Sequence, residues 1–540
     1  MTAESERERR FVAWGTALAA AALLLGFAVH ELWRDEAQAW WLARDAPGFG
    51  SLLTGEARRY EGHPFLWFWV LRLASLFSTD QQALTFVAFA LALANAVSIL
   101  TLPGLARFQR ALAAFSYFPL FEYGVIARSY ALSLFCLLVA VRWLGAQSRL
   151  RHVVVGVFAG LAVNTVLAAA IPALIVLAVG YVPRVVDTLR ARRLGALGEA
   201  GWLVAPVSFG LFVLGAVVTT PVAPDAVAEL GPLPPPTLDT LHELGARFFQ
   251  AFFPIPEPAP SDGVWWSTNA LLPDFDRLPQ VLPRHRILSG LCAPVGAGAA
   301  VAWLVALRKN LVATLALGAG FALTLGLFVR LPVHAIRYEG HLVLCVLCAV
   351  AAVAQVTPSV LRGRLVAYVF GLTFGAGVLG AAVALYKDAT TAFSQSRNAA
   401  RRLTELGART TPIVAFEYYR MAPVAAYVDR EFYAPELGEA ISHGVWSRSW
   451  HRADYFSASP TVVRRGICWA LATARTGKPT LLVTTGPMAF GPELSGALRL
   501  DSSHVGSQPH EDYWIYVVDP TRARNARPAF ACPEPVRLWR

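Results

Sequence analysis

The sequence is poor in charged residues. Of its 540 residues only 15% are Asp, Glu, Lys or Arg, whereas 56% are hydrophobic, and the mean hydropathy is +0.47. A soluble protein carries about 25% charged residues. Several apolar runs of roughly 20 residues, the length that crosses a bilayer, account for the shortfall. The composition therefore indicates an integral membrane protein.

Cysteine is also scarce, and its six residues form no disulfide framework. Four of them lie in or beside apolar runs, where cysteine behaves as a small hydrophobic residue: Cys136, Cys292, Cys345 and Cys348. The C-x-x-C spacing of the last two lies inside an apolar segment, which argues against a metal or redox role. The remaining two, Cys468 and Cys532, either pair or stay free, and the sequence leaves both alternatives open.

The net charge of +11 is not concentrated on one segment. The basic residues lie in short loops between apolar runs, for example at Arg149 and Arg151, at Arg308 and Lys309, and at Arg362 and Arg364. This is the positive-inside pattern, which reports orientation rather than a nucleic-acid partner. It predicts a multi-pass protein of the cell (inner) membrane with a cytoplasmic N-terminus and a C-terminal domain outside.

The hydropathy pattern divides the chain into three parts. Residues 1–10 read as a cytoplasmic tail, residues 11–386 as a helical membrane domain with about 11 crossings, and residues 387–540 as a small extracytoplasmic α/β domain. Strand-like segments in the last part lie at 412–416, 481–485 and 513–518.

Two segments of the membrane domain need separate mention. Residues 63–78 are expected to re-enter the membrane as a helix with Pro64 in its first turn. The placement of residues 103–122 stays open, because Arg107 and Arg110 fit poorly on an external side. External loops are expected at 31–62 and at 221–286, which is rich in proline.

Charged and aromatic residues gather in the loop 31–62. It opens on Arg34-Asp35-Glu36-Ala37-Gln38-Ala39-Trp40, and Tyr60-Glu61-Gly62-His63-Pro64 follows at its end. Adjacent acids beside a bilayer are costly unless they are solvated, paired or used. Taken alone, the acidic pair is explained by the preference of Asp and Glu for a helix N-terminus. Together with the later segment, it indicates a site for an anionic ligand at the membrane surface.

These two segments resemble the first external loop of the GT-C glycosyltransferases, in particular the bacterial branch related to protein O-mannosyltransferases and aminoarabinose transferases. The resemblance spans roughly residues 10–390 and is most specific at 34–64 and 122–130. It implies a polytopic enzyme that transfers a sugar from a polyprenyl-phosphate donor to an acceptor on the extracytoplasmic face. By this resemblance Asp35 is the general base, and Glu36 supports it or a metal.

Two further segments resemble the family's phosphate-binding motifs. In Glu122-Tyr123-Gly124-Val125-Ile126-Ala127-Arg128-Ser129-Tyr130, the arginine is expected to hold the carrier phosphate; the alternative is an ion pair between Glu122 and Arg128. In His334-Ala335-Ile336-Arg337-Tyr338-Glu339-Gly340-His341, the arginine is expected to contact the same phosphate; the alternative is a set of snorkelling interface residues. The candidate substrate- or phosphate-binding residues are Arg44, Glu61, His63, Glu122, Arg128, Tyr130, His334 and Arg337.

No cofactor is implied with certainty. A divalent metal cation stays open, with Asp35 and Glu36 as its candidate ligands. The chain has no glycine-rich phosphate loop and no D-x-D signature, which favours a lipid-linked donor over a soluble nucleotide sugar. The expected partners are a polyprenyl-phosphate-linked sugar, the lipid bilayer and an acceptor, which is a glycan, a lipid or a protein.

Two other classes compete with the enzyme. A transporter or flippase of lipid-linked saccharides also needs charged groups at a membrane cavity, but such proteins tend to show repeated halves and charges deep in the membrane. A non-catalytic scaffold of the cell envelope is the third reading. A change of Asp35 to Asn separates them, because only an enzyme loses activity while keeping its fold.

Overall fold

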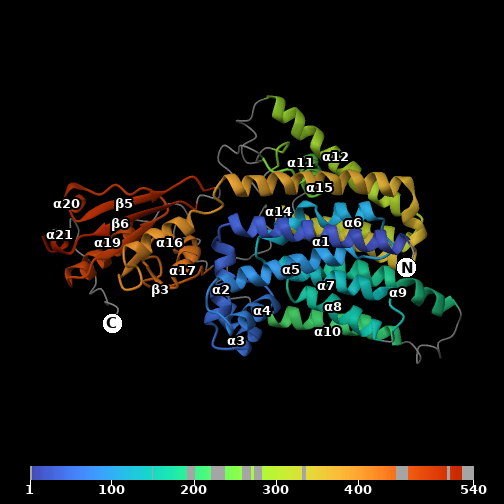
Figure 1. The fold of residues 1–540 in the computed structure, drawn as a ribbon, viewed down its shortest axis with the longest axis horizontal. Coiled ribbons are helices and arrows are strands. Elements are labelled where there is room, and N and C mark those ends of the chain that lie inside the picture. Colours follow the sequence, from blue (N-terminus) through green and yellow to red (C-terminus); the bar gives the residue numbers. More distant parts are fainter. Residues whose placement is uncertain are drawn as a thin grey trace.

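The computed structural model describes residues 3–148, 150–190, 201–220, 237–257, 269–272, 283–330, 336–445, 460–507 and 511–525. A bundle of long helices forms most of the molecule, and a small α/β domain adjoins one end of it (Figure 1). The N-terminus lies at the opposite end of the bundle.

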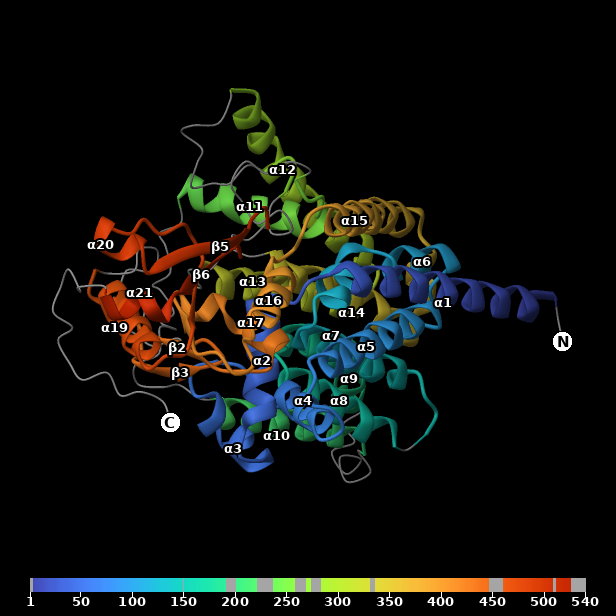
Figure 2. The same cartoon turned by 60° about the vertical axis from the view of Figure 1, so that its left-hand side comes forward.

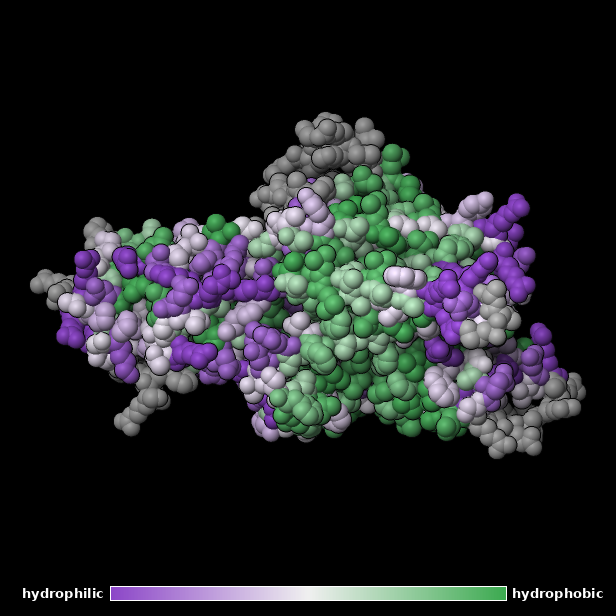
Figure 3. Space-filling model, in the orientation of Figure 1, coloured by the Kyte–Doolittle hydropathy of each residue, from purple (hydrophilic) through white to green (hydrophobic). Residues whose placement is uncertain are grey.

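Seven helical segments among the described residues are long and apolar enough to cross a membrane: Glu4–Val29, Gln82–Leu100, Leu167–Thr188, Gly290–Leu307, Leu311–Arg330, Ile336–Val356 and Arg364–Thr390. The space-filling view agrees with this assignment, because a broad apolar band covers the visible face of the bundle between two more polar ends (Figure 3). The chain is thus a multi-pass helical membrane protein. Its number of crossings stays a prediction.

The helices of the bundle are α1 (Ala3–Val29), α5 (Gln82–Leu100), α6 (Arg107–Ala114), the π-helix η2 (Phe118–Val125), α7 (Ser129–Leu144), α8 (Arg151–Val163), α9 (Ala170–Arg190), α10 (Val204–Thr219), α11 (Leu238–Phe252), α12 (Pro283–Leu307), α13 (Leu311–Arg330), α14 (Ile336–Val356) and α15 (Arg364–Thr390). Short 3-10 turns join some of them, at Leu167–Ala169, Gly201–Leu203 and Pro358–Arg362.

Helix α14 forms the centre of the bundle. In its membrane-length window 89% of the residues are buried, a larger share than in any other candidate span among the described residues. From Leu342 to Ala354 its sequence is apolar on all sides, as expected for a helix surrounded by others. Its N-terminal turn carries polar residues instead, and this turn lies at the end of the bundle nearest the α/β domain.

Three short helices lie between α1 and α5 at that same end: α2 (Arg34–Asp45), α3 (Phe49–Thr54) and α4 (Leu66–Ser75), with the 3-10 turn η1 (Glu56–Arg58). The re-entry of residues 63–78 into the membrane stays a prediction, but the helix there, Leu66–Ser75, is shorter than expected. At a rise of about 1.5 Å per residue, the ten residues of α4 span about 15 Å, half of a bilayer's hydrocarbon core. Pro64 precedes this helix and does not lie in its first turn.

The segment 103–122, left open by the sequence, belongs to the bundle. Helix α6 and the π-helix η2 follow each other there, and η2 is buried along its whole length. Arg107 bonds to Glu4 and Glu8, and Arg110 bonds to Glu8. These bonds place both arginines at the end of the molecule where α1 begins, and so remove the conflict over their side.

The C-terminal domain contains one six-stranded sheet in the order β3-β2-β1-β4-β6-β5. Strand β1 runs parallel to β2 and β4, whereas β6 runs antiparallel to β4 and β5. The strands are β1 (Ile413–Ala415), β2 (Phe432–Ala434), β3 (Glu439–Ile441), β4 (Thr480–Thr484), β5 (Leu498–His504) and β6 (Tyr513–Val518). The helices are α16 (Ser396–Glu405), α17 (Ala422–Val428), α19 (Pro460–Arg475), α20 (Pro492–Ser495) and α21 (Pro520–Asn525).

Three of these strands, β1, β4 and β6, lie where the sequence predicts strands; the short or exposed β2, β3 and β5 were missed. Cys468 in α19 is disulfide-bonded. Cys532 lies outside the described residues. The other four cysteines are free and buried, as expected for residues of apolar helices.

The C-terminal domain rests directly on α2 and the residues before it (Figure 2). Trp41 donates from Nε1 to the carbonyl of Ala422 at 3.2 Å, and Ser396 donates to the carbonyl of Leu32 at 2.8 Å. Tyr427 accepts the N–H of Leu32 at 3.2 Å. The region around α2 is therefore enclosed between the bundle and the α/β domain.

Candidate active site

Helix α2 begins with the acidic pair that the sequence singles out. Trp33 is the N-cap, and its backbone N–H donates to Oε2 of Glu36 at 3.1 Å. This contact is one half of a capping box, which satisfies a backbone donor that the helix itself cannot satisfy. Asp35 and Glu36 stand beside the positive end of the helix dipole. They then point in different directions.

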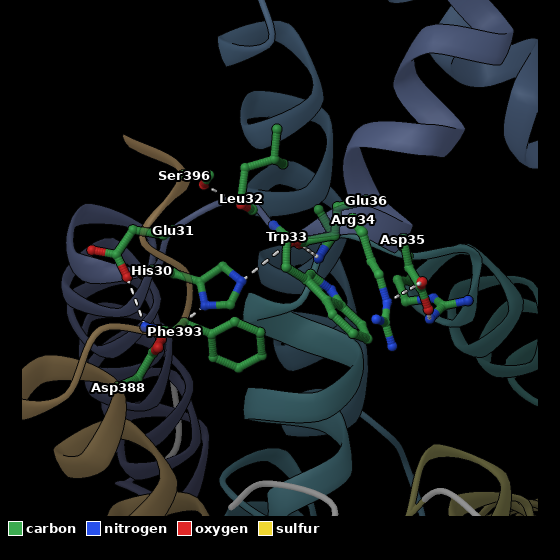
Figure 4. A network of polar contacts seen from close by, with 12 residues as sticks. His30, Glu31, Leu32, Trp33, Arg34, Asp35, Glu36, Asp388, Phe393 and Ser396 are labelled. Atoms are coloured by element: carbon green, nitrogen blue, oxygen red, sulfur yellow. Dashed lines mark hydrogen bonds and ion pairs between the residues drawn. The ribbon is translucent and has the colours of Figure 1, made fainter. Parts of the chain in front are cut away.

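Glu36 turns into the protein interior. Its Oε1 accepts the N–H of Ala127 at 2.5 Å, and its Oε2 lies 3.3 Å from Nε2 of His30. The other ring nitrogen of His30 lies 3.0 Å from Asp388 at the end of α15 (Figure 4). Only 1% of Glu36 is exposed. Glu36 therefore links the ends of α1 and α15 to the residue just before Arg128.

Asp35 turns instead towards three arginines. Its Oδ2 pairs with Arg128 and lies 3.5 Å from a terminal nitrogen of Arg337, while its Oδ1 lies 3.7 Å from Nε of Arg34 (Figure 4 shows the last pair). The same three guanidinium groups surround the ring of Trp33, at 5.7 to 6.0 Å from its centroid. Asp35 is the carboxylate that all three contact.

Each of these arginines lies at the N-terminus of a helix. Arg34 is the first residue of α2, Arg128 is the N-cap of α7, and Arg337 is the second residue of α14. The π-helix η2 closes just before Arg128 with a bond from the N–H of Ile126 to the carbonyl of Phe121. Three helix N-termini therefore converge on Asp35, and each adds its dipole to the positive charge of its arginine.

The electrostatics of Asp35 follow from this setting. Burial alone disfavours its charged form, but the charges of Arg128, Arg337 and Arg34 outweigh burial and lower the pKa of Asp35 to about 2. Asp35 is consequently ionised throughout the physiological range. Its charge balances one of the three positive charges around it.

Glu61 and His63 lie next to this cluster. Gln38, one turn along α2 from Asp35, donates from Nε2 to Oε1 of Glu61. The Nδ1 of His63 donates to the carbonyl of Glu61 at 2.8 Å. Gly62 between them has a φ of +63°, a conformation that glycine adopts at little cost and that closes this turn.

The turn is held in place by Arg58, which the sequence did not single out. Arg58 is 1% exposed and donates to the backbone carbonyls of Leu52, Leu53, His63 and Thr219. Burial lowers its pKa to about 10. A single arginine thus ties the loop after α3 to the end of α10. No sequence motif marks it, because its acceptors are backbone groups.

Tyr130 and Glu122 lie near the cluster without pairing with its arginines. The ring of Tyr130 lies 5.7 Å from the guanidinium carbon of Arg128 and stacks on Tyr123 at 5.0 Å. Oε2 of Glu122 accepts a hydrogen bond from Tyr117 at 3.2 Å. The alternative of an ion pair between Glu122 and Arg128 is therefore wrong; Arg128 pairs with Asp35.

Two candidate residues stand apart from the cluster. Arg44, at the far end of α2, lies 3.9 Å above the ring of Trp41, pairs with Asp45 at 2.8 Å and with Asp429 at 2.5 Å. It joins α2 to the C-terminal domain, so the structure does not bring it to Asp35. His334 lies outside the described residues.

Sequence reasoning also missed His30, Trp33, Arg34 and Gln38 as parts of the site. Arg34 and Gln38 are inside the quoted motif, and the spacing of three residues between Asp35 and Gln38 on a helix could have indicated a shared face. His30 gave no signal, because its partner Asp388 is 358 positions away in the chain.

The two candidate metal ligands are arranged unfavourably for a cation. Asp35 is surrounded by three guanidinium groups, and Glu36 already accepts two backbone N–H bonds and faces His30. The described part of the chain contains no group of three or more His, Cys, Asp or Glu side chains that could hold a metal ion. We therefore derive no step through a metal.

No protein-family model and no curated protein matches the sequence. Two solved structures are similar over almost the whole chain. The crystal structure of ArnT from Cupriavidus metallidurans in the apo state has a TM-score of 0.48 and 15% identity, and covers 96% of this chain and 99% of its own. The structure of the same protein bound to undecaprenyl phosphate has a TM-score of 0.44 and 14% identity, with 94% and 97% covered. At these values the likeness assigns no residue and no activity to this chain.

Proposed function

We propose that this protein is a membrane glycosyltransferase that moves a sugar from a polyprenyl-phosphate donor to an acceptor at the outer face of the membrane. The observation that supports this most strongly is the convergence of three arginine-bearing helix N-termini on one carboxylate. Positive charge exceeds negative charge there, so a phosphate is a fitting ligand.

The position of the cluster fits a lipid-borne phosphate. It lies where the helix bundle meets the polar α/β domain, so a phosphate held there is at the membrane boundary while its chain remains in the apolar region. A small, partly open pocket of the bundle is lined mainly by aromatic and aliphatic residues that include Tyr117, Phe252, Trp303 and Phe374. Tyr117 also bonds to Glu122 near the arginines.

The chemistry assigned to the arginines is stabilisation of the leaving group. When the bond between the sugar and the phosphate breaks, negative charge grows on the phosphate oxygens. Preorganised donors around that charge are worth about 100- to 1,000-fold in rate each. A proton must also leave the acceptor hydroxyl. The resemblance implies Asp35 for this task, and Glu61, a candidate substrate-binding residue, is a second carboxylate close to Asp35.

Orientation is part of the proposal. Helices α6, α8 and α15 begin at Arg107, Arg151 and Arg364, and Arg107 bonds to Glu4 and Glu8 near the N-terminus. These helix starts lie at the end of the bundle opposite the α/β domain (Figure 1), as the positive-inside rule expects for a cytoplasmic side. We therefore place the N-terminus in the cytoplasm of a cell (inner) membrane and the C-terminal domain outside. The acceptor, whether glycan, lipid or protein, would approach from that domain.

The test is release of free polyprenyl phosphate from a panel of radiolabelled polyprenyl-phosphate sugars by purified protein in lipid vesicles, with envelope extract as acceptor. Wild type is compared with Arg128→Ala, and with Arg107→Ala as a control arginine from the other end of the bundle. We expect turnover by wild type and the control and a loss of at least 100-fold in Arg128→Ala. EDTA is expected to leave turnover unchanged.

Other outcomes contradict parts of the proposal. If wild type binds donor and never consumes it, the transferase assignment fails, and movement of labelled donor between leaflets would point to a flippase. Equal turnover by wild type and Arg128→Ala would remove the arginine cluster from the chemistry. Loss of turnover in EDTA would show a metal and overturn our reading of Asp35 and Glu36.

A further inference from the structure

A second carboxylate, that of Glu61, lies against the face of α2 that carries Asp35. Asp35 and Gln38 are three residues apart, so their side chains project from the same side of the helix. Gln38 donates to Oε1 of Glu61 and thereby holds that carboxylate on this face. The other oxygen, Oε2, lies 3.9 Å from Nδ1 of His63. Within the described residues, no arginine pairs with Glu61.

The two carboxylates differ in how far their oxygens are committed. Both oxygens of Asp35 face guanidinium groups: Oδ2 faces Arg128 and Arg337, and Oδ1 faces Arg34. The guanidinium groups stabilise the ionised form of Asp35, so it is a weaker base. Glu61 is fixed by one neutral amide and keeps Oε2 available for a hydroxyl.

We infer that Glu61 accepts the proton of the acceptor hydroxyl, while Asp35 stays ionised and holds the three arginines in place. The inference rests on the proposed function and names the base of that reaction. The hydroxyl oxygen bonds to the anomeric carbon of the sugar, and the bond from that carbon to the phosphate oxygen breaks. Its electron pair leaves on the polyprenyl phosphate, and the hydroxyl proton passes to Glu61 and later to water.

The charges that face Glu61 support this division of roles. Burial raises its pKa to about 7; the hydrogen bond from Gln38 opposes this rise, the charge of Asp35 adds to it, and Arg128 and Arg58 oppose it. A general base works best with a pKa near the working pH. Two neighbouring carboxyl groups whose environments separate their pKa values commonly divide such roles between them.

His63 completes the set of titratable groups around Glu61. Burial and the charge of Arg128 lower its pKa to about 4, so it is neutral at pH 7 and adds no charge. Its Nδ1 proton is held by the carbonyl of Glu61. The rate of the free enzyme should therefore rise as Glu61 loses its proton near pH 7 and level off above.

The experiment measures kcat/KM for donor consumption from pH 5 to pH 9, because this ratio reports ionisations of the free enzyme. The variants are Glu61→Gln and Asp35→Asn, with Glu56→Gln as the control, since Glu56 is an exposed acid of the same loop. Glutamine at position 61 keeps an oxygen for Gln38. Binding of polyprenyl phosphate is measured in parallel, because it shows that each variant keeps its site.

We expect Glu61→Gln to bind polyprenyl phosphate as wild type does, to lose about 100- to 10,000-fold in kcat/KM and to lose the rise near pH 7. Asp35→Asn should keep that rise and move it to lower pH, because Asp35 raises the pKa of Glu61. Glu56→Gln should match wild type. Two results would overturn the inference: a rise of kcat/KM near pH 7 that persists in Glu61→Gln, or a rise that is lost in Asp35→Asn but kept in Glu61→Gln. An inactive wild type would instead mean that the proposed transferase itself fails.

Discussion

Two clusters of arginine and carboxylate side chains lie at opposite ends of the helix bundle. At the N-terminal end, Arg107 bonds to Glu4 and Glu8, and Arg110 bonds to Glu8. At the other end, Arg34, Arg128 and Arg337 share Asp35. Both clusters consist of arginines and carboxylates, but they differ in how exposed the side chains are and in the numbers of positive and negative charges.

In the N-terminal cluster the carboxylates are at least as numerous as the arginines, and the side chain of Glu4 is 74% exposed. Such pairs contribute at most about 1 kcal/mol. In the Asp35 cluster the carboxylate side chain is 17% exposed, and one negative charge faces three positive ones. An imbalance that is buried is costly unless something balances it. The comparison teaches that the balance of charge and its burial, rather than the number of ion pairs, mark the site.

The largest effect is expected from removing the support of the Asp35 cluster. His30→Ala leaves Glu36 and Asp388 buried without the histidine between them, and loss of one partner from a buried pair costs about 3–5 kcal/mol. We expect a clearly lower temperature of unfolding in detergent, followed by scanning fluorimetry. His152→Ala is the control, because that histidine is half-buried and bonds to a tyrosine.

The pH dependence of this support has a defined sign. Burial lowers the pKa of His30, but Asp388 and Glu36 outweigh burial and raise it well above its usual value. A raised pKa gives a stabilisation that is complete below about pH 6.5, the usual pKa of histidine, and that declines only as the pH passes the raised value. The difference in stability between wild type and His30→Ala should therefore stay constant between pH 6 and pH 7. If this difference already shrinks in that range, His30 is not held in its charged form.

The second effect concerns the arginines themselves. Arg337→Ala should lower kcat/KM by about 100- to 1,000-fold, because it removes one donor to the charge that grows on the phosphate. Arg337→Lys should recover part of the loss, since lysine keeps the charge but not the fork of donors. Activity is measured as release of polyprenyl phosphate. If Arg337→Lys has as low a kcat/KM as Arg337→Ala, then Arg337 acts through the geometry of its forked donors rather than through its charge.

A smaller effect sharpens the comparison between the clusters. Asp35→Asn removes the carboxylate that competes with a phosphate for Arg34, Arg128 and Arg337, so polyprenyl phosphate should bind about tenfold more tightly, a change of about 1.4 kcal/mol. Glu8→Gln, the matched change in the N-terminal cluster, should leave binding unchanged. Weaker binding in Asp35→Asn would mean that Asp35 orders the arginines more than it competes for them.

The sequence could predict those parts of the fold and of the site that depend on residues close together in the chain. The helical class and the strands of the sheet's centre follow from hydropathy and alternation. The motif residues Asp35, Arg128 and Arg337 do come together, since each was expected beside the external end of a helix. The inward turn of Glu36 could not be predicted, because it depends on Ala127 and His30, which approach only in the folded chain.

Two errors have physical causes of a different kind. Arg44 was grouped with the site because it lies in the same loop, but it is ten residues from Arg34 along α2 and so is displaced by most of that helix's length. There it meets Trp41 and Asp429. The helix expected from residue 63 begins only at Leu66, with Pro64 outside it, because apolar composition alone does not mark the residue at which a helix starts.

The smallest effect is expected at the N-terminal cluster. Arg107→Ala removes the ion pairs to Glu4 and Glu8, yet these groups are partly exposed and remain solvated when unpaired, so stability should fall by less than about 1 kcal/mol and the difference should shrink further in high salt. Unfolding temperatures in low and high salt measure both quantities. Turnover should be unchanged, because the cluster lies at the far end of the bundle from Asp35. A loss of turnover with an intact fold would show that paired arginines at the N-terminal end influence the site across the bundle, and the balance of charge would then no longer separate a structural cluster from a functional one.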